Sequence, residues 1–101
     1  MATIHVSENE MNRTVTISIR NRFDFGTHKE FRSSYKDRAN SECYVIDLQE
    51  VNFIDSSALG MMLLLREHAM ANKGKVIIEN CNPDIRNILT IANFERLFEI
   101  R

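Results

Sequence analysis

Alternating apolar and polar residues predict two strands at the start of the chain. Residues 3–7 (TIHVS) and 14–19 (TVTISI) place an apolar side chain at every second position, and the polar segment 8–13 separates them. Such alternation is typical of a strand with one buried face, because successive side chains point to opposite sides of a sheet. The two segments therefore predict a β-hairpin that buries one face.

Two apolar runs further along predict strands of another kind. Residues 43–48 (CYVIDL) and 75–80 (KVIIEN) are rich in consecutive apolar and β-branched side chains. A continuous run of this kind is typical of a strand that is covered on both sides. A short last strand is expected at residues 97–100 (LFEI).

Helical signals lie between these strands. Thr27 is expected to be the N-cap of a first helix of about three turns, with Glu30 three positions later as in a capping box. A second helix is expected over residues 56–72, and Gly74 offers the left-handed residue that ends it. The Asn-Pro pair at 82–83 predicts the start of a third helix, with Asn as N-cap and Pro at the first helical position.

The resulting order, β-β-α-β-α-β-α-β, indicates the fold class. Alternating strands and helices after an initial hairpin imply an α/β fold, in which helices pack against a mixed, mostly parallel sheet. The length of 101 residues is that of one domain, expected over residues 1–101. With 44% hydrophobic and 27% charged residues, the composition is that of an ordinary soluble globular protein.

Charge and cysteine usage narrow the function classes. The net charge of −1 argues against nucleic-acid binding, which needs a basic surface. Cys43 and Cys81 are expected to be small buried hydrophobes in a reducing compartment. The longest apolar run, 61–65, is too short to span a bilayer, and no signal peptide is recognisable. A cytoplasmic location is therefore expected.

No cofactor, metal ion or catalytic residue is expected. His5, His28 and His68 share no metal-ligand spacing with one another or with the cysteines. The glycines are isolated, so the chain has no glycine-rich phosphate loop. A serine nucleophile would need an assignable base and an elbow such as G-x-S-x-G, whereas the sequence has D-S-S-A-L-G.

One short polar segment interrupts the most apolar part of the chain. Asp55, Ser56 and Ser57 separate an apolar run that ends at Ile54 from the helix expected over 56–72. Helix capping accounts for polar residues at this seam, because Asp and Ser are preferred N-caps. One capping residue is enough, however, and the chain has three.

Phosphorylation offers a second interpretation of the seam. A serine hydroxyl in the first turn of a helix points outward, where free N–H groups and the helix dipole favour an added phosphate. The phosphate would add about −1.5 to −2 charges beside Asp55. A partner docked there would meet a dianion, and burying it unpaired costs several kcal/mol.

Met61 and Leu64 are either partly exposed, extending this surface, or buried by neighbouring helices.

Residues 44–65 (YVIDLQEVNFIDSSALGMMLLL) resemble the signature of STAS domains, specifically the stand-alone anti-sigma factor antagonists. The likeness extends through residues 74–98 (GKVIIENCNPDIRNILTIANFERLF), and the pair Phe23-Asp24 is similar to the family's Leu-Asp pair after the second strand. The resemblance implies a STAS-type fold over essentially the whole chain.

The resemblance also implies a regulatory protein without catalysis of its own. The unphosphorylated antagonist would bind a serine kinase that is also an anti-sigma factor, with a histidine-kinase-like ATPase fold. That kinase would phosphorylate the serine directly after the motif Asp, which is Ser56 here, with Ser57 as second choice; a PP2C-type phosphatase would reset the switch. The chain itself is expected to be a monomer. The residues expected to bind the partner are Asp24, Asp55, Ser56, Ser57, Ala58 and Met61.

Two departures from the family pattern concern the partner surface. Ala58 stands where the family usually has Gly, which stiffens the first helical turn. Asn21 and Arg22 stand where a Gly is common; Asn tolerates a left-handed conformation, and Arg22 changes the expected partner surface. Two other functions stay open: a small serine-dependent hydrolase centred on Ser56 or Ser57, and a constitutive scaffold with a non-sigma output.

Overall fold

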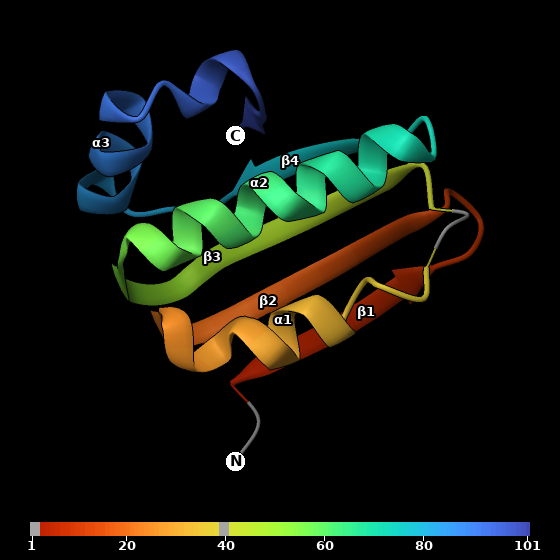
Figure 1. The fold of residues 1–101 in the computed structure, drawn as a ribbon, viewed down its shortest axis with the longest axis horizontal. Helices are drawn as coiled ribbons and strands as arrows, with labels where there is room; N and C mark the ends of the chain where they lie inside the picture. The colour runs from red at the N-terminus through yellow and green to blue at the C-terminus, as the bar shows by residue number, and fades with distance from the viewer. Residues whose placement is uncertain (1–2, 39–40) are drawn as a thin grey trace.

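The computed structural model of the protein describes residues 3–38 and 41–101. Strands and helices follow one another in the expected order (Figure 1). The elements are β1 (Ile4–Asn9), β2 (Thr14–Phe23), the 3-10 turn η1 (Phe25–Thr27), α1 (His28–Ser33), β3 (Cys43–Ile54), α2 (Ser56–Ala71), β4 (Lys75–Glu79), α3 (Pro83–Ile91), the 3-10 turn η2 (Phe94–Arg96) and β5 (Glu99–Ile100).

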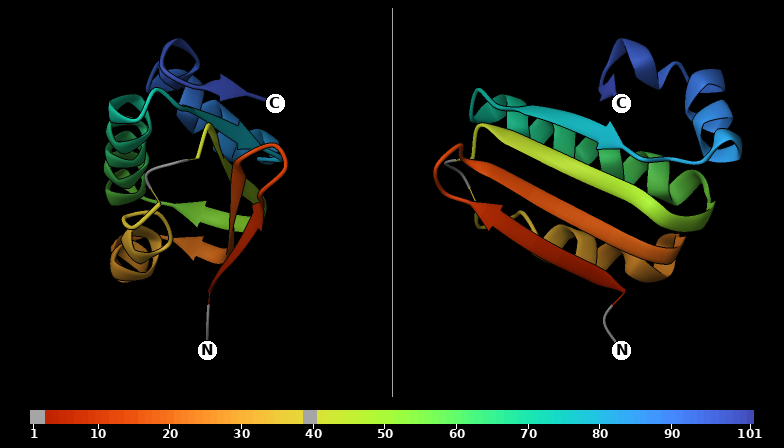
Figure 2. Two further views of the ribbon diagram at one scale, coloured as in Figure 1. Left: turned by 90° about the vertical axis from the view of Figure 1, so that its right-hand side faces the viewer. Right: turned by 180° about the vertical axis from the view of Figure 1, so that it is seen from behind.

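Within the described residues, five strands form one sheet in the order β1-β2-β3-β4-β5. β1 pairs antiparallel with β2, and the other neighbouring pairs are parallel. α1 and α2 lie side by side on one face of the sheet, and α3 lies beyond the carboxyl end of β4 (Figure 1, Figure 2). The expected α/β class, the mixed and mostly parallel sheet and the initial hairpin are confirmed.

The main core lies between the sheet and the helices on its covered face. Val15, Ile17 and Ile19 of β2 point into this core and are at most 1% exposed. Val45 of β3 and Ile77 of β4 alternate with core residues and so point to the opposite face, where they are buried as well. β3 and β4 are therefore buried on both sides, as their continuous apolar runs predict.

β2 and β3 are longer than the sequence pattern indicates. The alternation of β2 stops after Ile19, but its pairing with β3 continues to Phe23 through register shifts around Asn21. Asn21 has a φ of 62°, the left-handed conformation that this residue type tolerates. The extension makes Phe23 and Ile54 partners at the very end of the two strands.

Two expected helix ends differ in detail from the structure. Thr27 stands at the N-cap position of α1 as expected, but its side chain makes no capping hydrogen bond, because Oγ1 donates to the carbonyl of Asp24 at 2.8 Å; α1 is also shorter than three turns. Lys73, with a φ of 61°, takes the left-handed position expected of Gly74. Gly74 instead allows the backbone of Ser41 to pass close by, since a Cβ at position 74 would lie 3.0 Å from the carbonyl oxygen of Ser41.

Candidate functional site

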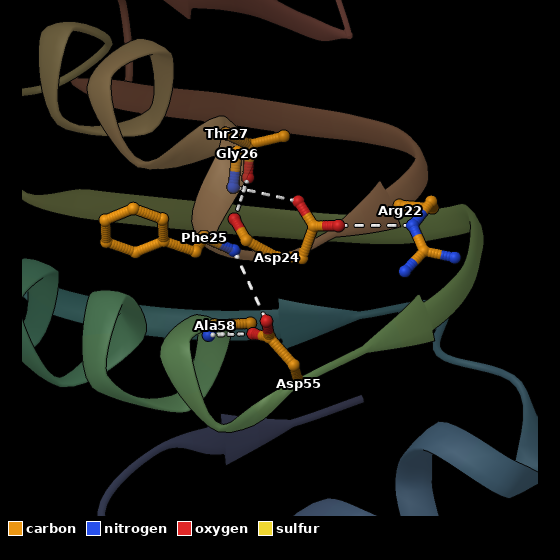
Figure 3. A network of polar contacts seen from close by, with 7 residues as sticks. All are labelled: Arg22, Asp24, Phe25, Gly26, Thr27, Asp55 and Ala58. Atoms are coloured by element: carbon orange, nitrogen blue, oxygen red, sulfur yellow. Dashed lines mark hydrogen bonds and ion pairs between the residues drawn. The ribbon is translucent and has the colours of Figure 1, made fainter.

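The candidate site lies where β2 and β3 end side by side. Phe23 pairs with Ile54, and the next residues, Asp24 and Asp55, leave the sheet together (Figure 3). The backbone N–H of Asp55 donates to the carbonyl of Phe23 at 3.4 Å. Parallel strands bring their carboxyl ends to one edge of a sheet, so two aspartates that are far apart in the sequence become neighbours.

Asp55 joins the start of α2 to the turn after β2. Its Oδ1 accepts a hydrogen bond from the N–H of Ala58 at 3.0 Å, which caps the helix, and its Oδ2 accepts from the N–H of Phe25 at 3.4 Å (Figure 3). The backbone of Asp55 is extended (φ −118°, ψ −178°), as is typical of an N-cap residue. The capping interpretation of the seam is confirmed, and the capping residue is Asp55.

Ser56 and Ser57 occupy the first two positions of α2. Ser56 is exposed and Ser57 is half-buried. Because the carboxylate of Asp55 provides the cap, the start of the helix does not depend on either hydroxyl. The first-turn N–H groups of α2 and the positive end of its dipole lie beside them.

Asp24 is held on both sides. Its Oδ1 accepts from the N–H of Gly26 at 3.0 Å, and its Oδ2 accepts from Nε of Arg22 at 3.1 Å (Figure 3). The guanidinium of Arg22 lies over the ring of Phe53, 4.0 Å from the ring centroid. The structure thus places Asp24 beside Asp55, with an arginine and an aromatic ring attached to the same network.

Two exposed aromatic side chains flank this network, and the sequence analysis did not single them out. Phe25 is 65% exposed and stacks on the ring of His28, with 4.7 Å between centroids; Phe53 is 40% exposed. A signal for Phe25 exists in the sequence, because an aromatic residue between Asp24 and Gly26 sits in a turn rather than in a strand or helix period. Phe53 has no such signal, since it falls beyond the predicted strand.

Two of the residues expected to bind a partner are buried. Ala58 is 0% exposed and Met61 is 7% exposed, and both belong to the core. Of the two alternatives left open for Met61, burial is the one found, because α2 packs against α1 as well as the sheet and therefore buries a wide arc of its surface. Leu64 is 57% exposed. The accessible members of the expected set are Asp24, Asp55, Ser56 and Ser57.

The hydrogen bonds of two histidines lie away from the serines. Nδ1 of His28 is 3.1 Å from a backbone carbonyl of η1. Nε2 of His68 is 2.9 Å from the carbonyl of Arg38, and its ring packs against Tyr35 and Tyr44. Burial raises the pKa of both tyrosine hydroxyls. None of these contacts gives Ser56 a general base.

The cysteines and the remaining polar groups offer little further chemistry. Cys43 and Cys81 are free thiols and half-buried, and burial raises the pKa of the Cys43 thiol, opposed by the nearby Lys75. Residues 3–38 and 41–101 contain no group of three His, Cys, Asp or Glu side chains that could hold a metal ion. The same part of the chain has no helix that is long and apolar enough to cross a membrane.

Comparison with known proteins identifies a family and a relative. The family model for the STAS domain matches residues 5–101. A STAS-domain containing protein of Pseudomonas aeruginosa (strain UCBPP-PA14) is 49% identical over 87 residues, which cover 85% of this chain and 86% of the relative.

Solved structures share the fold at low sequence identity. The anti-sigma factor antagonist SpoIIAA in its unphosphorylated form has a TM-score of 0.78 at 18% identity, covering 97% of this chain and 86% of SpoIIAA. Phosphorylated SpoIIAA from Bacillus has a TM-score of 0.75, also at 18% identity, covering 97% of this chain and 90% of the other. An anti-sigma factor antagonist from Mycobacterium paratuberculosis has a TM-score of 0.80 at 19% identity, covering 97% and 83%.

Proposed function

Because the chain belongs to the STAS domain family, we propose that it is a partner-switching regulator of the anti-sigma factor antagonist type. The unphosphorylated chain binds a protein that is both serine kinase and anti-sigma factor and has a histidine-kinase-like ATPase fold. Phosphorylation of Ser56 releases this partner, and a PP2C-type phosphatase restores the binding form. The chain contributes no catalysis of its own and acts in the cytoplasm as one domain over residues 1–101.

The exposed Ser56 hydroxyl at a start of α2 that is already capped carries this proposal. Since Asp55 accepts the capping hydrogen bond from Ala58, a phosphate on Ser56 leaves the cap in place. The free N–H groups of the first turn and the helix dipole favour the added negative charge. Ser57, which is half-buried, is the second choice of acceptor.

Electrostatics accounts for release of the partner. The phosphate brings about −1.5 to −2 charges to an edge that already holds the carboxylates of Asp24 and Asp55. An interface that fits a neutral hydroxyl would have to desolvate this dianion without a matching cation, which costs several kcal/mol. A loss of about 4 kcal/mol lowers an affinity roughly a thousandfold.

Pull-down of endogenous partners with three variants tests the proposal. Ser56→Ala should capture a kinase-like partner and Ser56→Asp should not. Ser33→Asp is the matched control, because it adds the same charge at an exposed serine of α1 and should capture the partner normally. Equal capture by Ser56→Ala and Ser56→Asp, with unchanged circular dichroism, would reject the switch and favour a constitutive scaffold. Phosphopeptide mass spectrometry that places phosphate on Ser57 alone would move the site and keep the mechanism.

A further inference from the structure

Arg22 is a pre-oriented cation with unused hydrogen-bond donors. Its Nε donates to Oδ2 of Asp24 at 3.1 Å, and its guanidinium rests on the ring of Phe53 at 4.0 Å. Within the described residues this bond to Asp24 is the one polar contact of the side chain, so the N–H groups on both terminal nitrogens face solvent. The side chain is 60% exposed although it is held from two sides.

The carboxylates around Arg22, in contrast, are satisfied within the chain. Both oxygens of Asp24 accept hydrogen bonds, from Gly26 and Arg22, and both oxygens of Asp55 accept from backbone N–H groups. Arg22 is therefore the charged side chain here that still has free hydrogen-bond donors, and these donors lie in the plane of its guanidinium. Such a planar fork of N–H donors matches a carboxylate in a bidentate arrangement.

Arg22 and Phe53 lie at the same strand ends as Ser56. Arg22 and Phe53 are partners in the ladder between β2 and β3, one step before the terminal pair of Phe23 and Ile54. Phe23 and Ile54 point into the core under the helices, so Arg22 and Phe53 point to the opposite face by strand alternation. Phe25, 65% exposed, stacks on His28 of α1 and therefore lies toward the helices, apart from Arg22 (Figure 3).

We propose that Arg22 and Phe53, here called the arginine-aromatic surface, recognise an acidic-apolar segment of the protein partner. An Asp or Glu side chain of that segment pairs with the free N–H groups of Arg22, and an adjacent apolar side chain packs on the exposed part of the Phe53 ring. Arginine and aromatic side chains, phenylalanine included, are enriched at protein–protein interfaces. The inference rests on the proposed function, because the partner that docks over Ser56 is taken to be the same protein that contacts the arginine-aromatic surface. That partner would approach the sheet from the carboxyl ends of β2 and β3.

Charge complementarity selects a single carboxylate over a polyanion. A nucleic acid or polyphosphate would bring several negative charges against the carboxylates of Asp24 and Asp55, and the neighbouring Arg20 is already paired with Glu50 at 3.3 Å. A phosphate on Ser56 belongs to the start of α2, on the helix-covered face, whereas Arg22 points to the other face. Recognition by Arg22 and release by phosphorylation are therefore two separate contributions to one interface.

Selection of random peptides displayed on phage against the immobilised unphosphorylated chain tests the inference. The selected peptides should carry Asp or Glu beside an apolar residue. A synthetic copy should bind Arg22→Gln roughly ten- to a hundredfold more weakly than the unmodified chain. Arg22→Lys should fall in between, because it keeps the charge and loses the planar fork. Arg20→Gln on the same strand is the matched control and should leave the affinity unchanged.

A double-mutant cycle shows whether the ion pair between Arg22 and the acidic residue of the peptide accounts for the affinity. Changing the acidic residue of the peptide to its amide should weaken binding to the unmodified chain and have little further effect on Arg22→Gln. Selected peptides without acidic residues, or equal affinities for the unmodified chain and Arg22→Gln, would overturn the inference. Circular dichroism verifies that substitutions at these exposed positions leave the fold intact.

The two proposals fail separately. The peptide measurement needs neither kinase nor phosphate, so its result stands even where Ser56→Ala and Ser56→Asp capture a partner equally and the switch is rejected. If binding ignores Arg22 while Ser56→Asp still releases the partner, the arginine-aromatic surface is wrong and the switch stands.

Discussion

Replacing Asp55 tests whether one carboxylate holds the seam between β3 and α2 together. Asp55→Ala removes both the hydrogen bond to Ala58 that caps the helix and the bond to the turn at Phe25. Asp55→Asn keeps one side-chain oxygen that can cap the helix, but it removes the charge and the second acceptor, because an amide NH2 cannot accept the bond from Phe25. The two variants therefore separate loss of the cap from loss of the other two features.

The expected loss of stability follows from the two contacts. Loss of an N-cap lowers the free energy of unfolding by about 1 kcal/mol. The bond to Phe25 is long, at 3.4 Å, and water can replace it at the exposed turn, so it adds at most about 0.5 kcal/mol. Asp55→Ala should therefore lose about 1–1.5 kcal/mol. Asp55→Asn should lose less than about 0.5 kcal/mol, because Asn is an equally good N-cap.

Urea denaturation followed by far-UV circular dichroism measures both changes. With a slope of about 1–3 kcal/mol per molar urea, Asp55→Ala should lower the midpoint by roughly 0.3–1.5 M at unchanged slope. Asp37→Ala is the control, since it removes an exposed aspartate outside this network. A loss below about 0.3 kcal/mol for Asp55→Ala would refute the cap. An equal loss in Asp55→Asn would show that the charge or the second acceptor, and not the cap, is responsible.

Met61 is buried and Leu64 is exposed, so their substitutions should differ in effect. Met61→Ala should lower the free energy of unfolding by about 2–4 kcal/mol because it leaves a cavity in the core. Leu64→Ala, at an exposed position, should change it by less than about 0.5 kcal/mol, and thermal melting of both variants checks the contrast. Lys73→Gly should stabilise the protein by about 0.5 kcal/mol, since relief of the left-handed backbone outweighs the added freedom of the unfolded chain; a lower melting temperature would contradict this. Burial raises the pKa of the Cys43 thiol, so its alkylation by iodoacetamide should be slower than that of free cysteine and reach half its maximal rate at a higher pH. Mass spectrometry of the Cys43 peptide gives the rate, and a pH profile like that of free cysteine would contradict the role of burial.

Much of the fold follows from signals that act over a few residues. The alternation in β1 and β2 and the continuous runs of β3 and β4 predict these strands. Asn82 starts α3 as expected, because its Oδ1 accepts from the N–H of Ile85 at 2.9 Å, three positions along the chain. Asp55 caps α2 by the same local geometry. Such signals survive in a single sequence because the groups that interact are covalently close.

The helix boundaries show where local signals stop. Thr27 and Gly74 are reasonable boundary residues by composition, yet each is used differently in the structure. The hydroxyl of Thr27 bonds back to the carbonyl of Asp24 instead of capping α1, and a Cβ on Gly74 would lie only 3.0 Å from the carbonyl oxygen of Ser41. Neither neighbour is visible to a pattern that considers one helix at a time.

For the candidate site, local sequence indicates which groups are present at the start of α2, and folding sets which groups surround them. Asp55 followed by Ser56 and Ser57 at a helix start is a local pattern, and it predicts both a cap and a phosphate acceptor. Which residues share that edge depends on the register between β2 and β3, and this register places Asp24 beside Asp55 and Arg22 beside Phe53. Burial of the Met61 side chain depends on how α2 packs against its neighbours. Register and packing are decided by the whole core at once, because they join groups that are close only after folding.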